Sequence, residues 1–308
     1  EGRAEGQLLS AARFRRSELL LVALAAAAAA TSSPLAKVAH GLSFAQIGAG
    51  RCAVGAIVLL AMAPRATWRA VAGLDARGRI AVIGGGVLLG LHFALFLGGL
   101  LATSLPAAAA LVSLEPLAVV LAAWVAFGAR PNAREQVGIA LATAGAAVVA
   151  RGAGQGEHTL IGDALVLGAV AVYGVYVAFA RWIGSAMPTT SYAACVFAIA
   201  ACTLAVAVPF APGDARIAPS GASWLAVLAL GLVPTAVGHT LLQRASRRVP
   251  ASIVALVSPG ETLGSILIGA SMGALPSTVE WLGALLVVVG ASVAVLGARP
   301  SGRDARAP

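Results

Sequence analysis

Long apolar runs, each close to twenty residues, dominate the pattern of this chain. Ten runs can be placed, at 18–39, 44–63, 80–101, 106–127, 135–150, 161–183, 189–210, 222–243, 250–272 and 277–297. A bilayer core about 30 Å thick requires about 20 apolar residues in a helix, so each run predicts a transmembrane helix. Clusters rich in Pro, Gly and Arg separate most runs, and the connections around 102–105 and 273–276 predict tight turns.

Composition excludes most other classes of protein. Of the 308 residues, 59% are apolar and only 11% are charged, and the mean hydropathy is +0.92. A soluble enzyme, a disordered chain or a nucleic-acid-binding domain needs far more polar surface. A transmembrane β-barrel would alternate apolar and polar residues. Three cysteines (Cys52, Cys195 and Cys202) lie inside apolar runs with no metal-ligand or disulfide spacing, so we expect buried thiols. The predicted fold class is all-α, a polytopic membrane protein.

The net charge of +9 comes from arginines that cluster between the runs. With the N-terminus in the cytoplasm, seventeen basic residues fall on the cytoplasmic side and two, Arg151 and Arg216, on the other. This bias predicts ten spans with both termini cytoplasmic. The basic stretch 13–16 before an apolar run also resembles a signal peptide. We favour a first span, because the repeat described next supplies a counterpart for it.

The chain carries an internal duplication at an offset of about 145 residues. A series in the first half recurs in order in the second, and Pro64 recurs as Pro209. Four domains follow: a cytoplasmic tail, 1–17; a first five-helix repeat, 18–152; a second repeat, 161–297; and a cytoplasmic tail, 298–308. The series is Gly128, Pro131, Glu135, Gly138, Gly145 and Gly152, matched by Gly273, Pro276, Glu280, Gly283, Gly290 and Gly297.

Five helices per repeat is an odd number, so the second copy must enter the membrane in the opposite sense. Inverted repeats of this kind build secondary transporters, whose substrate site lies near the midplane between the halves. The pattern therefore predicts two inverted five-helix repeats and a transport function.

Some of the repeated residues predict structural roles. Asn132-x-x-Glu135 and Ser277-x-x-Glu280 each follow a proline and precede an apolar run, which is typical of a capping box. A catalytic role for these glutamates is the alternative. The glycines spaced by seven predict close helix packing. That packing is either within the chain or across a homodimer.

Two glutamates lie deep inside predicted spans, where an ionisable side chain requires a partner, a cavity or a function. Glu115 follows Pro106 by about 13–14 Å along its helix, and Glu261 follows Pro250 by about 16–17 Å. Ser258, Glu261, Thr262 and Ser265 share one helical face. We expect a polar cavity wall in which a glutamate binds a substrate amine or takes up a proton. A buried neutral acid is the alternative.

Other polar and aromatic residues within the spans are candidates for the same cavity. Arg51 either pairs with a carboxylate or an anionic substrate, or extends its charged end to the membrane interface. For Lys37 we favour extension to the interface. His92 and, less strongly, His239 are each a proton relay or a core histidine. Tyr173 and Tyr176 either line the cavity or pack.

These patterns resemble the EamA-type transporters of the drug/metabolite transporter superfamily over residues 18–297. Three stretches carry the resemblance: Thr31-Ser32-Ser33-Pro34-Leu35-Ala36-Lys37 with Arg51; Pro106-Ala107 through Ser113-Leu114-Glu115-Pro116-Leu117 to Gly128, Gly138 and Gly145; and Val249-Pro250-Ala251-Ser252 through Glu261 to Gly273, Gly283 and Gly290. The resemblance implies ten helices in two inverted repeats, a bacterial inner membrane, and transport of small metabolites, often export of amino acids.

The chain departs from the family pattern in two places. The usual glycine–glutamate pair that ends the fourth and ninth helices is Gly128-Ala129 and Gly273-Ala274 here. The counterpart of Glu115-Pro116 is rearranged to Pro259-Gly260-Glu261. The second departure weakens any transfer of substrate roles onto the ninth helix.

The predicted function is secondary transport of a small metabolite, most simply proton-coupled export of amino acids by alternating access. An anionic or phosphorylated substrate is the first alternative, because Lys37 and Arg51 could hold a negative group together. An intramembrane enzyme or a membrane scaffold is more remote, since the spans carry no protease motif. We expect no enzyme activity, no cofactor, no metal site and no nucleic-acid partner. The expected partners are a small-molecule substrate and the lipid bilayer, with a homodimer left open.

Overall fold

The computed structural model describes residues 16–128, 130–152, 156–183, 187–211, 213, 217–246 and 257–297. Every regular element within these ranges is helical. The predicted tails lie outside the described residues, apart from positions 16 and 17. The same holds for the first seven residues of the predicted ninth span.

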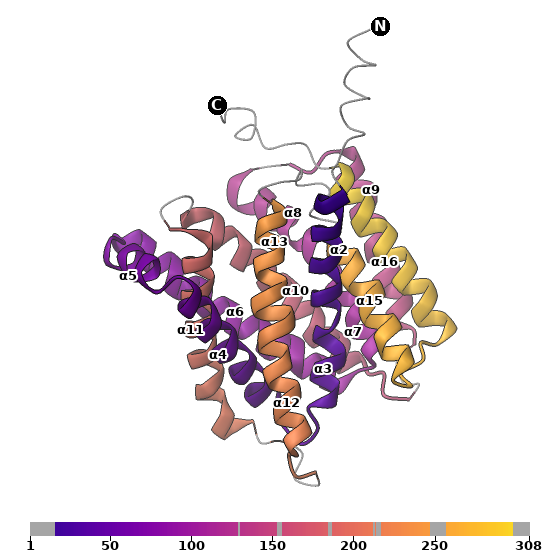
Figure 1. Cartoon of the computed structure of the whole chain (residues 1–308). Coiled ribbons are helices and arrows are strands. Elements are labelled where there is room, and N and C mark those ends of the chain that lie inside the picture. Colours follow the sequence, from indigo (N-terminus) through magenta and orange to yellow (C-terminus); the bar gives the residue numbers. More distant parts are fainter. Residues whose placement is uncertain are drawn as a thin grey trace, which may run out of the picture.

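The elements follow the predicted runs closely (Figure 1). They are α2 (Arg16–Ala30), α3 (Ser32–Val38), α4 (Phe44–Met62), α5 (Pro64–Ala72), α6 (Ala76–Ala102), α7 (Leu105–Val112), α8 (Glu115–Phe127), α9 (Ala133–Ala150), α10 (Leu160–Ile183), α11 (Thr189–Ala207), η1 (Val208–Phe210), α12 (Gly221–Leu230), η2 (Gly231–Gly238), α13 (His239–Ser246), α15 (Val257–Ser271) and α16 (Thr278–Gly297).

The helices form one bundle with two distinct ends. The upper end in Figure 1 is where α2 begins and α13 ends, and the lower end is where α3 ends and α16 begins. Both predicted tight turns lie at the lower end, between α6 and α7 and between α15 and α16.

The outward surface of the bundle is apolar, as a lipid-facing surface must be. Large aliphatic side chains there are mostly exposed, among them Ile57, Val125 and Leu267. Exposed tryptophans lie near helix ends, with Trp124 toward the upper end and Trp224 and Trp281 toward the lower end. Tryptophan favours the boundary between lipid and water, so this distribution fits a protein that crosses a bilayer.

Seven helices among the described residues are long and apolar enough to cross a membrane. They match seven of the ten predicted runs: Leu20–Val38, Phe44–Met62, Ala76–Ala102, Leu105–Ala126, Leu160–Val177, Thr189–Phe210 and Gly221–Leu242. The other three runs are also helical, as α9, α15 and α16, and α16 contains the shorter apolar stretch Thr278–Ala294.

One connection differs from its prediction. The Pro- and Arg-rich segment 64–79 is expected as a loop, but the structure forms α5 and then starts α6 at Ala76. Pro64 begins α5, where its missing N–H has no helical partner to lose. Thr67 is buried, and its hydroxyl donates to Ser191 of α11 at 3.1 Å. Trp68 on another face is 75% exposed. A helix this short cannot cross a bilayer but can lie along it.

The contacts between helices repeat when the halves are exchanged. Helix α4 packs on its counterpart α11, and α9 packs on its counterpart α16. The contact of α6 with α10 is matched by that of α13 with α2, and the contact of α8 with α10 by that of α15 with α2. The duplication in the sequence is therefore also present in the packing.

Helices α9 and α16 cross in opposite directions through their glycines. Gly138 lies against Gly290, and Gly145 lies against Gly283, so the order along α9 is reversed along α16. A Cβ on Gly138 would lie 2.6 Å from the Gly290 carbonyl oxygen, and one on Gly145 would lie 2.8 Å from that of Gly283. The glycine stripe thus serves packing within the chain, one of its two predicted uses.

Breaks inside two helical columns open space at the centre of the bundle. The fourth predicted span divides at Ser113 into α7 and α8, because Pro116 cannot donate to the preceding turn. The eighth span widens into the π-helix η2, which contains Pro234. The hydroxyl of Thr235 bonds the carbonyl of Leu230 at 2.8 Å. Such π segments often occur at functional sites.

Candidate functional site

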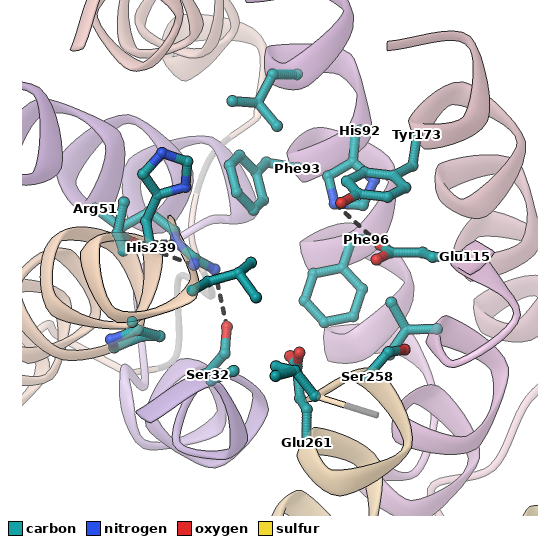
Figure 2. A pocket seen from close by; sticks show the side chains of 18 of the residues that line it. Ser32, Arg51, His92, Phe93, Phe96, Glu115, Tyr173, His239, Ser258 and Glu261 are labelled. Carbon is teal, nitrogen blue, oxygen red and sulfur yellow. Dashed lines mark hydrogen bonds and ion pairs between the residues drawn. The ribbon is translucent and has the colours of Figure 1, made fainter. Parts of the chain in front are cut away.

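A central cavity of about 290 Å³ lies between the two halves (Figure 2). Both halves line it, so neither repeat could form it alone. That volume is at the lower limit of ligand pockets in proteins, which suits a small metabolite. The first half contributes Ser32, Arg51, Leu89, His92, Phe93, Phe96, Val112 and Glu115, and the second contributes Tyr173, Tyr176, Phe197, Thr235, His239, Ser258, Glu261 and Thr262 among others.

Arg51 is a buried cation, 5% exposed, that contacts only neutral groups closely. Its guanidinium donates to Ser32 Oγ at 3.1 Å and to Thr235 Oγ1 at 3.2 and 3.3 Å. Its Cζ lies 4.4 Å from the centre of the Phe93 ring, a cation–π contact. Among the described residues, no carboxylate oxygen lies within 4.0 Å of it. A buried guanidinium held in this way is prepared to bind an anion.

His92 and Glu115 form the closest pair of ionisable groups in the cavity. His92 Nδ1 lies 3.0 Å from the carbonyl oxygen of Ala169. A carbonyl can only accept, so Nδ1 carries a proton and Nε2 faces the cavity. There Nε2 lies 3.7 Å from Glu115 Oε1. The pair can therefore hold one proton on either side, as a neutral pair or as an ion pair.

Glu261 enters the cavity from α15, with Ser258 and Thr262 beside it. Its carboxylate forms no hydrogen bond or close ion pair with the rest of the described chain. Figure 2 shows its oxygens directed into the cavity, with Arg51 on one side and Glu115 on another. Ser265, expected on the same polar face, instead donates to the Ala30 carbonyl at 2.8 Å. That bond connects α15 to the end of α2, because the two helices pack directly there.

Aromatic rings form much of the cavity wall. Tyr173 lies 5.3 Å from the ring of His92 and 5.7 Å from that of Tyr176. Phe96 stacks parallel to His92 at 6.1 Å. His239 also reaches the cavity and meets Phe197 edge-on at 5.7 Å. The cavity therefore offers apolar surface around a few charged groups.

Lys37 is the one predicted site residue that the structure does not bring to this cavity. It lies at the lower end, where its ammonium contacts Glu157 and the Thr103 carbonyl, both at 2.9 Å. It lines a second cavity of about 600 Å³ that shares no residue with the first. Lys37 and Arg51 therefore line different cavities, and the structure does not bring them together around one anion.

Sequence reasoning missed several wall residues. Thr235 accepts two of the hydrogen bonds from the Arg51 guanidinium. A threonine within an apolar run is common, so the sequence does not mark it as a site residue. Pro234 beside it was the only signal of an irregular helix. Ser32 was noted only as part of a motif, and Phe93 and Phe96 look like ordinary core residues until His92 is placed between them.

Comparison with known proteins agrees with this architecture. A crystal structure of a protein at 23% sequence identity superimposes with a TM-score of 0.60, covering 91% of this chain and 98% of that one. At this identity the likeness extends to the fold alone. No curated protein matches the chain. The model of the EamA-like transporter family matches twice, over residues 16–151 and 160–296, which are the two predicted repeats. The chain belongs to the EamA-like transporter family, and thus to a family of membrane transporters.

Proposed function

We propose that this protein is a secondary transporter with ten membrane spans in two inverted five-helix repeats. The antiparallel crossing of α9 and α16, together with the matched contacts of the two halves, supports the inversion. The three helices shorter or less apolar than the rest, α9, α15 and α16, cross the bilayer within the bundle. A cavity between inverted halves is where an alternating-access transporter binds its substrate.

The substrate class is a small zwitterion such as an amino acid, which the protein exports. The observation that carries this assignment is a buried guanidinium and two carboxylates in one small cavity (Figure 2). Arg51 binds the substrate carboxylate in its fork of donors. Glu261 or Glu115 binds the amine, and the aromatic wall contacts the side chain. The negative charge of the substrate thus pairs with Arg51, and its positive charge pairs with a glutamate.

Transport is coupled to protons through Glu115, with His92 as its relay. The Nε2–Oε1 separation of 3.7 Å is longer than a hydrogen bond, so a proton passes between the two side chains when they close to hydrogen-bond distance or when one water bridges them. A proton on this pair removes the negative charge that holds the substrate amine, so proton uptake and amine release are linked.

The protein operates in a bacterial inner membrane with the upper end, and both termini, in the cytoplasm. The seventeen-to-two distribution of basic residues supports this orientation. An anionic or phosphorylated substrate is the second candidate, favoured by Arg51 alone. The two glutamates disfavour it, since they would repel a dianion. An enzyme or a scaffold requires neither inverted repeats nor a cavity with charged side chains between them.

Flux across a sealed bilayer tests the proposal. Purified protein in proteoliposomes is assayed with labelled neutral amino acids, their amide and amine analogues that lack the carboxylate, and a phosphorylated metabolite. We expect saturable uptake of amino acids, driven by a pH gradient, and none of the analogues. Uptake of the phosphorylated compound alone would show that the substrate is anionic and not zwitterionic. Absence of any flux would refute transport.

Substitution of the glutamates separates binding from coupling. Glu115→Gln is expected to abolish pH-driven accumulation while retaining exchange of one substrate molecule for another. Glu135→Gln is the matched control, because this glutamate lies on a helix cap outside the cavity. If both Glu115→Gln and Glu261→Gln keep full pH-driven transport, the coupling proposal is wrong.

A further inference from the structure

A second cluster of ionisable side chains is buried at the lower end of the bundle. His158 lies between two carboxylates, with Nε2 2.8 Å from Asp163 Oδ2 and Nδ1 3.5 Å from Glu280 Oε1. These three side chains are at most 7% exposed. Removing one member of such a buried set is costly, because it leaves another polar or charged group without compensation.

The cluster joins the first half of the chain to the second. The Ser104 hydroxyl donates to Glu280, and the Thr103 hydroxyl donates to Asp163 Oδ1 at 3.0 Å. Thr103 and Ser104 form the turn between α6 and α7, whereas Asp163 lies in the first turn of α10 and Glu280 in the first turn of α16. We call Thr103, Ser104, His158, Asp163 and Glu280 the inter-repeat cluster.

The equivalent glutamate of the first half, Glu135, makes no such link to the described residues of the second half. Glu135 and Glu280 both complete capping boxes, as predicted: the backbone N–H of Asn132 donates to Glu135 at 2.6 Å and that of Ser277 donates to Glu280 at 2.8 Å. Beyond its cap, Glu280 reaches Ser104 and His158. Within the described part of the chain, Glu135 forms no hydrogen bond or ion pair with the second half. Among the described residues, the link at the lower end has no equivalent at Glu135, and the positions that correspond to Thr103 and Ser104 lie outside those residues.

The inter-repeat cluster borders the second cavity. Ser104 and Glu280 line that cavity, together with Lys37, Glu157 and Gly269. Between it and the central cavity lie closely packed segments of α7 and α15, in which Ala108 and Ile266 are buried. A Cβ on Gly269 would lie 2.7 Å from Leu105 Cδ2, so α15 and α7 are in tight contact. Separation of the halves at this point would join the two cavities.

We propose that the inter-repeat cluster is a latch that keeps the lower end of the transport pathway closed, and that its rupture opens the central cavity into the second cavity. This proposal rests on the transport function proposed above. The residues of the latch are positioning residues: they touch no substrate, and they set how often the lower end opens.

Thiol accessibility measures that opening without any substrate. In a cysteine-free background, Ala108→Cys places a reporter inside the closed segment, and intact cells receive a membrane-impermeant maleimide. Leu275→Cys, at a position 77% exposed at the lower end, calibrates labelling from outside. Thr103→Val removes one hydroxyl without changing size, and Glu280→Gln removes the charge. Glu135→Gln is the control for damage to a helix cap.

We expect the reporter at position 108 to react about tenfold faster in Thr103→Val and in Glu280→Gln, since a hydrogen bond to a charged group contributes about that factor to an equilibrium. Glu135→Gln should leave the rate unchanged. In proteoliposomes the two latch variants should change the maximal rate of transport and leave KM unaltered. A smaller folded fraction would also lower the maximal rate at constant KM, so the rate is expressed per amount of protein that elutes as one species in size-exclusion chromatography.

Equal labelling in all three variants would refute the latch and leave the transport function standing, because flux is measured separately. Labelling that differs as expected, with no flux of any substrate, would refute transport and retain the cluster as a lock between the halves. Unchanged labelling of the Leu275→Cys reporter across the variants shows that the amount of protein in the membrane and the access of the reagent are equal.

Discussion

His92 Nε2 lies 3.7 Å from Glu115 Oε1, and the two side chains belong to different helices, α6 and α8, of the first half. The contact exists because α8 begins at Glu115, after the break at Ser113, so that the carboxylate faces the cavity. The other ring nitrogen of His92 is engaged by the Ala169 carbonyl, which orients the imidazole.

This pair predicts non-additive effects on proton coupling. His92→Gln and Glu115→Gln should each abolish accumulation driven by a pH gradient, and the double variant should be no worse than either single one. Substrate exchange without a gradient should persist in all three. The measurement is labelled uptake with and without an imposed pH difference. Full pH-driven accumulation in either single variant would mean that the two side chains do not act as one coupling unit.

The hydrogen-bonded fork of Arg51 predicts a strong effect of a conservative substitution. Arg51→Lys keeps the charge but loses two of the donors directed at Ser32 and Thr235. We expect KM for carboxylate substrates to rise about 10- to 100-fold, since hydrogen bonds to charged groups are worth about 1.5–3 kcal/mol. Lys37→Gln, which alters the cation outside the central cavity, should leave KM unchanged. Equal changes of KM in the two variants would show that Arg51 does not bind the substrate carboxylate.

The close crossing of α9 and α16 predicts that Gly145 cannot be replaced by a residue with a side chain. Gly145→Ala would bring a Cβ within 2.6 Å of the Val287 backbone nitrogen. We expect a destabilisation of about 1–3 kcal/mol and a Tm lower by several degrees. Gly98→Ala is the matched control, because its Cβ would meet nothing closer than 3.9 Å. Thermal unfolding in detergent is the measurement, and equal Tm values for both variants would contradict the close crossing.

The short helix α5 predicts a segment that lies in the membrane interface. Trp68 is 75% exposed and is flanked on the same helix by Arg65 and Arg69. A nitroxide at position 68 should report the depth of lipid headgroups, by its relative accessibility to oxygen and to a water-soluble nickel chelate. A nitroxide at Leu121 should report the hydrocarbon core. Accessibility values at position 68 equal to those of a nitroxide in bulk water would contradict the prediction.

Several features were predicted from the sequence because they depend on neighbouring residues. The apolar runs predicted the helices with shifts of only a few residues at most ends. The capping boxes at Asn132 and Ser277 formed as expected, since their partners lie three residues away. Gly128 and Gly273, matched by the repeat offset, both adopt positive φ at a helix end. The match of the family to both repeats confirms the predicted family.

The sequence by itself determined that the chain is a duplicated, helical membrane protein, because hydropathy, turn residues and repeat spacing are local or periodic signals. Only the tertiary structure decided which polar side chains meet. Arg51 is joined to Thr235 across 184 positions, and Lys37 pairs with Glu157 at a different cavity from Arg51. Such contacts depend on how helices from opposite halves rotate and pack against one another, and the identity of a single residue carries no information about that rotation.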